Sequence, residues 1–197
     1  MMENTSMKDE SRDILVRLSR TKDRLTVLRE LNWKVIQWRA AASVRGSQTR
    51  SADPLVPEDV VQPIAGLLAD TDQAIRREAT WLLGQLGGGK HVPVLQSIAT
   101  ASDPNVSEET KTAACEALAT IGGPAAVETL KRCTRPGNPD QVVYAAVVGL
   151  QSIPGTRGVF GPAGGPSGHI KEAIDAVAQN HPSRAVRLIA RSMSSRL

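Results

Sequence analysis

Aromatic residues are scarce in this chain of 197 residues, at 3% of the sequence: three Trp, one Tyr and one Phe. The core must therefore be filled by Ala, Val, Leu and Ile, which suits thin layers of closely packed helices. No apolar run reaches the roughly 18 residues that a membrane helix needs, so we expect no membrane span. The first six residues are polar and lack the apolar segment of a signal peptide, so we expect a cytoplasmic protein.

Cysteine and histidine are scarce too, with two and three residues. Two cysteines give no disulfide framework, and we expect Cys133 in the core and Cys115 beside it to be reduced thiols. The histidines stand near expected turns, without partners at metal-ligand spacing, and are expected to be solvated: His91, His169 and His181. No nucleophile-histidine pattern is present. The sequence therefore predicts no catalytic, cofactor-binding or metal-binding residue, and favours a protein that is not an enzyme.

The net charge of +4 is unevenly distributed. Residues 1–50 carry eleven Lys or Arg against six acidic residues, and residues 51–150 carry seven against twelve. Residues 151–197 carry six against two. Basic ends thus flank an acidic middle, and such a middle disfavours nucleic acid as its partner.

The chain does contain a recurring amphipathic helix. Residues 75–87 place apolar side chains on one face at helical spacing and then stop at glycine. The same stripe recurs 35 and then 32 positions later: Ile75, Ala79, Leu82, Leu83 and Leu86; Thr110, Ala114, Ala117, Leu118 and Ile121; Val142, Ala146, Gly149, Leu150 and Ile153. The alanine kept in each copy allows two helices to approach closely.

A second helix recurs between these copies. Its apolar positions are Val61, Ile64 and Leu67, then Val92, Leu95 and Ile98, then Val127, Leu130 and Cys133. The repeated unit is thus helix, turn, helix, turn, with a period in the low thirties. Neither helix can bury its apolar face alone, whereas stacked neighbours bury both, as in a helical solenoid.

These residues resemble the HEAT-like repeats first described in phycobilisome lyase subunits. The signals are Asp-x-x-Ile-Arg-Arg-Glu-Ala at residues 72–79 and Leu-Gly-x-Leu-Gly at residues 83–87. The stretch from Ala114 to Val127 is similar, and the resemblance extends over residues 58–153. It implies an all-α fold, a right-handed α-solenoid of about four to five HEAT-like helix pairs without strands. The lyases themselves attach or remove bilins, usually with a partner subunit.

We expect one continuous domain with four parts. Residues 1–50 form an N-terminal helical cap and a diverged repeat, with a helix break near residues 19–21 or near Asn32. Residues 51–153 form three regular helix pairs, and residues 169–197 a C-terminal pair. Between them, residues 154–168 hold six glycines, three prolines and Phe160. They read either as a mobile linker or as an inserted loop that orders on binding.

The candidate partner-binding residues lie opposite the core stripe of the second helices, which usually line the concave surface of such folds. They are Arg77, Trp81, Thr112, Glu116, Tyr144 and Val148, with Phe160 from the inserted loop. Large aromatic side chains have no packing role there, and they anchor interfaces well. Alternatively, a neighbouring helix covers Trp81. Trp33 and Trp38 are assigned to packing of the diverged repeat.

Three functions stay open. The first is a non-catalytic scaffold or adaptor that holds a protein partner on a curved helical surface. The second, implied by the resemblance, is a bilin lyase-like or phycobilisome-associated factor. The third is a nucleic-acid backbone binder that uses the basic ends. No cofactor is expected, and the oligomeric state is left open.

Overall fold

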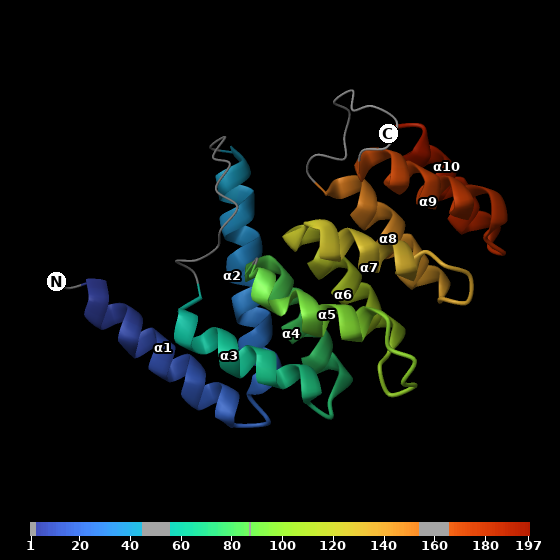
Figure 1. Ribbon diagram of the computed structural model, residues 1–197. Helices are drawn as coiled ribbons and strands as arrows, with labels where there is room; N and C mark the ends of the chain where they lie inside the picture. The colour runs from blue at the N-terminus through green and yellow to red at the C-terminus, as the bar shows by residue number, and fades with distance from the viewer. Residues whose placement is uncertain (1–2, 45–55, 87, 154–165) are drawn as a thin grey trace. The chain divides into compact units, whose positions relative to one another are not determined.

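The computed structural model describes residues 3–44, 56–86, 88–153 and 166–197 (Figure 1). These residues form helices and turns and contain no strand, which confirms the all-α prediction. Their ten α-helices are α1 (Glu3–Ser19), α2 (Arg24–Val44), α3 (Glu58–Gly66), α4 (Gln73–Leu86), α5 (Val92–Ala99), α6 (Glu108–Ile121), α7 (Pro124–Cys133), α8 (Asp140–Ser152), α9 (Pro166–Asn180) and α10 (Arg184–Ser194). Consecutive helices form five pairs. The three regular pairs expected within residues 51–153 correspond to α3 with α4, α5 with α6 and α7 with α8, and the C-terminal pair corresponds to α9 with α10.

The chain divides into two compact units, residues 1–88 and 89–197. Unit 1 holds α1 to α4 and unit 2 holds α5 to α10, and each has its own apolar core. The expectation of one continuous domain stays a prediction. Phe160 and most of the expected insertion at residues 154–168 lie outside the described residues, and α9 begins at Pro166.

Unit 1 contains the diverged first repeat. Its helix break falls at residues 20–23, between α1 and α2. This agrees with the first of the two predicted positions, near residues 19–21. The fully buried side chains of its core include Leu28 and Leu31 of α2, Ile64 of α3, and Leu82 and Leu83 of α4. Thus the first helix pair contributes to the same core as the regular repeat that follows it.

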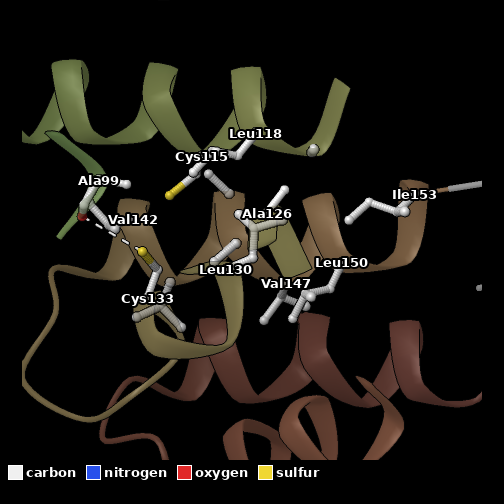
Figure 2. Packing of buried hydrophobic residues seen from close by; sticks show 14 of the residues in the cluster. Ala99, Cys115, Leu118, Ala126, Leu130, Cys133, Val142, Val147, Leu150 and Ile153 are labelled. Carbon is white, nitrogen blue, oxygen red and sulfur yellow. Dashed lines mark hydrogen bonds between the residues drawn. The ribbon is translucent and has the colours of Figure 1, made fainter. Parts of the chain in front are cut away.

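Unit 2 contains three helix pairs around a core of small and medium side chains (Figure 2). Leu95, Leu118, Leu130 and Leu150 are completely buried, and Figure 2 shows three of them where α6, α7 and α8 meet. The predicted stripe is therefore the buried face of these helices. Burial of such apolar surface stabilises folding by about 25 cal/mol per Å².

Local sequence also sets where α6 begins and ends. The Ser107 hydroxyl accepts a hydrogen bond from the Thr110 backbone N–H at 3.3 Å, which satisfies an otherwise unpaired amide of the first turn. The helix ends at Gly122, whose φ of 72° is in the left-handed region that favours glycine. These signals place α6 in the register that buries its stripe.

An arginine side chain forms hydrogen bonds to the turn between α3 and α4, and an equivalent arginine does so between α9 and α10. Arg76 donates to the backbone carbonyls of Asp70 at 2.5 Å and Thr71 at 3.2 Å. Arg187 donates to those of His181 at 2.5 Å and Pro182 at 2.8 Å. The similarity of residues 185–187 to residues 74–76 in the sequence thus reflects a shared structural role.

Enlarging the small residue of the stripe should destabilise unit 2. Ala114 has no exposed surface, so Ala114→Leu should overpack the core and cost roughly 1–3 kcal/mol of unfolding free energy. Urea denaturation measures the loss. The control is Ala125→Leu on the exposed side of α7, which should leave the midpoint nearly unchanged. Equal midpoints for both variants would contradict this register.

Candidate functional site

The candidate residues of unit 2 lie on one face of its second helices, α6, α8 and α10. These helices are neighbours, because α8 packs against both α6 and α10. Their buried stripes begin at equivalent residues, Thr110, Val142 and Val186, none of which is more than 5% exposed. A residue two positions further along a helix points to the opposite side. The opposite face of each helix is therefore turned away from this core.

We call this surface the second-helix face and define it by two rows of equivalent positions. The first row is Thr112, Tyr144 and Leu188, and the second row, one turn later, is Glu116, Val148 and Ser192. Tyr144 is 45% exposed and Leu188 is 53% exposed. Two large hydrophobic side chains are thus exposed at equivalent positions of the neighbouring helices α8 and α10.

The α6 edge of the second-helix face is more polar. Partial burial of the Glu116 carboxyl raises its pKa above the ordinary value, although the residue as a whole is exposed. One turn earlier, the buried Thr112 hydroxyl oxygen has no hydrogen-bond partner among the described residues. Of these two groups only the Glu116 carboxyl is accessible to a hydrogen-bond donor from outside the chain.

Unit 1 also exposes large hydrophobic side chains, two of them on α2. The α2 and α4 helices lie alongside each other, joined by bonds from Asn32 Nδ2 to Glu78 Oε2 at 2.7 Å and from Arg39 Nη2 to the Gln85 carbonyl at 3.3 Å. On the solvent side of α2, Trp33 is 60% exposed and Ile36 is 46% exposed. This α2 face was not expected from the sequence.

Arg77 and Trp81, the candidates on α4, are both half-buried. The Arg77 guanidinium forms an ion pair with Glu78 at 3.1 Å. The sequence left two alternatives for Trp81, exposure on a binding surface or covering by a neighbouring helix. Its partial burial is intermediate between them. Whether either residue contacts a partner stays a prediction.

The structure corrects two sequence-based interpretations. Trp33 does not pack within the first repeat but is the most exposed of the large hydrophobic side chains described. His91 and His181 are not solvated, since they are 5% and 3% exposed, whereas His169 is exposed. For His181 the error arises because its surroundings include a residue distant in sequence, Asp140 of α8, 4.0 Å away.

The two cysteines are buried and free, as expected from the sequence. Figure 2 shows their sulfur atoms in the core between α6 and α7, where the Cys133 thiol donates to the Ala99 carbonyl at 3.6 Å. The hydrogen bond with Cys133, together with burial, raises the pKa of the Cys115 thiol well above its ordinary value. Cys115 is therefore a core residue whose surroundings favour the thiol over the thiolate.

Leu188 belongs to the second-helix face but was missed in the sequence. Its signal was present, because Ala190 is the alanine of the repeated stripe and Leu188 precedes it as Tyr144 precedes Ala146. The Arg-rich sequence of α10 obscured the alignment. In the part of the chain that the structure describes, no cluster of His, Cys, Asp or Glu could hold a metal ion, and no helix is long and apolar enough to cross a membrane.

Comparisons with known proteins agree with this architecture. Residues 60–151 match the family model described as HEAT repeats, so these residues are HEAT-like repeats. A similar solved structure is a chain from the complex of CpcE and CpcF of phycocyanin lyase from Nostoc sp. PCC7120. The alignment has 19% sequence identity and a TM-score of 0.56, and covers 88% of this chain and 99% of that chain. At this identity the similarity establishes a shared helical-repeat fold. No curated protein matches the chain.

Proposed function

We propose that this protein is a non-catalytic adaptor that binds a protein partner through the second-helix face. The observation that supports it most directly is the exposure of Tyr144 and Leu188 at equivalent positions of the neighbouring helices α8 and α10. Helical repeats present extended surfaces of this kind to their partners. The similar solved structure, itself a complex of two proteins, also favours a protein partner.

The composition of the face suits an interface centre. Tyr144 offers a large area with few rotatable bonds, and Leu188 adds aliphatic surface beside it. Small or polar residues surround them at Thr112, Glu116 and Ser192. This arrangement fits an apolar ridge on the partner, such as one face of an amphipathic helix, with hydrogen bonds at the rim.

The test uses charge reversal of the apolar pair with a matched control. Tyr144→Asp and Leu188→Asp should each weaken partner binding by tenfold or more, because a carboxylate must then be buried at the interface. Val94→Asp, at a residue 36% exposed on α5, is the control and should leave affinity unchanged. A photo-crosslinking residue at position 144 identifies the partner, and calorimetry with the purified partner measures the affinity.

Two outcomes would count against the adaptor. Equal loss of affinity in all three variants would indicate a general effect of surface charge. Unchanged affinity in Tyr144→Asp and Leu188→Asp, with folding intact, would place the interface elsewhere. In that case the next candidate residues are those of unit 1 on α2 and α4. They are tested by the variants Trp33→Ala, Ile36→Ala, Arg77→Ala and Trp81→Ala.

A second candidate function is a bilin lyase-like or phycobilisome-associated factor. It is favoured by the similarity of fold to a chain of the phycocyanin lyase complex. Adding a free bilin to the purified protein should then shift the visible absorption of the pigment, with saturation at one equivalent. An unshifted spectrum, both alone and with the partner found by crosslinking, would eliminate this candidate. Binding to nucleic acid with a steep salt dependence would instead support a backbone binder.

A further inference from the structure

Unit 2 contains a pocket of about 450 Å³ between the end of α7, the turn after it and α9. This volume is within the range of small-molecule sites. Small apolar residues form one side, among them Ala173 and Ala176 of α9. The other side carries Lys131, Arg132 and Arg135 from the last turn of α7 and the turn that follows. The pocket is separate from the second-helix face, and none of its residues belongs to that face.

A hydrogen-bonded bridge of the preceding repeat has no counterpart at this pocket. Between α5 and α7, Gln96 Nε2 donates to Thr129 Oγ1 at 2.7 Å and to the Ala125 carbonyl at 3.0 Å. Lys131 follows buried Leu130 as Gln96 follows buried Leu95, so it is the equivalent residue one repeat later.

Between α7 and α9 the equivalent residues do not form this hydrogen bond. Lys131 bonds instead to Glu128 within its own helix, at 2.9 Å. The equivalent of Thr129 is Ala173, which has no polar side-chain atom and precedes buried Ile174 as Thr129 precedes Leu130. Lys131 and Ala173, the residues at the two ends of the missing bridge, both line the pocket.

The lining of the pocket has an excess of positive charge. Lys131 is paired with Glu128 at 2.9 Å, but neither Arg132 nor Arg135 forms an ion pair within the described part of the chain. Both guanidinium groups are permanently charged and offer planar pairs of N–H donors.

A buried histidine completes the wall. His181 is 3% exposed, and its Nδ1 accepts the Ser183 backbone N–H at 3.2 Å. The neutral ring therefore carries its proton on Nε2, which lies 4.0 Å from Asp140 Oδ1. The hydrogen bond from Ser183 orients the imidazole, which lines the pocket together with the two arginines.

We propose that this pocket binds a small organic anion, a phosphate or a carboxylate attached to a compact apolar body. Arg132 and Arg135 pair with the anionic oxygens by charge-assisted hydrogen bonds. The apolar body lies against Ala173 and Ala176, where the side chains are too short to fill the space. A phosphate and a carboxylate share this recognition chemistry, and the probes below distinguish them.

Phenyl phosphate, benzoate and inorganic phosphate are the probes. They are titrated into the chain of residues 1–197, and binding is followed by calorimetry and by amide chemical shifts. Phenyl phosphate or benzoate should bind more tightly than inorganic phosphate, with shifts at residues 131–136 and 173–181. The double variant Arg132→Gln/Arg135→Gln should weaken the better probe by tenfold or more. Arg184→Gln, an exposed arginine on α10, is the charge-matched control for one arginine and should have no effect.

A second variant tests the apolar wall. Ala176 is exposed, so Ala176→Leu should fold normally, fill the pocket and weaken phenyl phosphate more than inorganic phosphate. The tighter of phenyl phosphate and benzoate identifies the preferred anion. Unchanged affinity in the double arginine variant, an equal loss in Arg184→Gln, or no binding of either organic probe would each overturn the proposal.

Discussion

Replacing the buried Leu130 with alanine is expected to lower the unfolding free energy of unit 2 by roughly 2–5 kcal/mol. The side chain has no exposed surface and lies where α7 meets α8. Leu130→Ala would remove its methyl groups and leave a cavity that the surrounding helices can close only in part. Urea denaturation followed by circular dichroism measures the loss, and a loss below about 1 kcal/mol would contradict this packing.

Two further variants make the Leu130 test specific. Leu130→Met conserves volume and should cost less than about 1.5 kcal/mol. In Gly149→Ala, the added Cβ would meet Ala119 Cβ at 3.0 Å and a Leu130 methyl at 3.4 Å. The effects of Gly149→Ala and Leu130→Ala should therefore be non-additive, because the second change relieves part of the crowding caused by the first. Strict additivity would show that the two residues do not touch.

Replacing Arg24 with methionine is expected to destabilise unit 1 by roughly 2–4 kcal/mol. Arg24 Nη1 contacts Asp70 Oδ2 at 2.7 Å, and Arg24 Nε donates to the Leu18 carbonyl at 2.9 Å. The Asp70 side chain is only 4% exposed, whereas that of Arg24 is 26% exposed. Arg24→Met would leave the buried carboxylate without its counter-charge, and that desolvation penalty is the main cost.

An exposed ion pair of the same unit is the control. Lys34 and Glu10 are 2.6 Å apart, slightly closer than Arg24 and Asp70, but both side chains are about half exposed, at 50% and 47%. Lys34→Met should therefore cost less than about 1 kcal/mol. The double variant Arg24→Met/Asp70→Asn should recover much of the loss, since it removes the unpaired charge. Equal costs for Arg24→Met and Lys34→Met would show that distance, and not burial, governs these pairs.

Some of the exposed candidate residues could be predicted from the sequence and others could not. The repeated stripe places Tyr144 opposite the core, and the structure leaves it 45% exposed. The same alignment, extended to α10, would have placed Leu188 beside it. Trp33 could not be assigned in this way, because the first repeat diverges and its register against α4 depends on bonds such as Asn32 to Glu78.

The sequence by itself determined the repeated helix pairs of residues 58–153 and their buried stripe. Helical periodicity repeats locally, and an apolar face that recurs on every helix has to be buried by its neighbours. Only the tertiary structure decided the burial of His91 and His181, the exposure of Trp33 and the pocket between α7 and α9. The physical reason is that the covering of a residue outside the stripe depends on side chains of another helix. Ala173 is such a case. It has no side-chain atom that could accept a hydrogen bond as Thr129 does, and the hydrophobic pattern of α9 alone does not predict a pocket beside it.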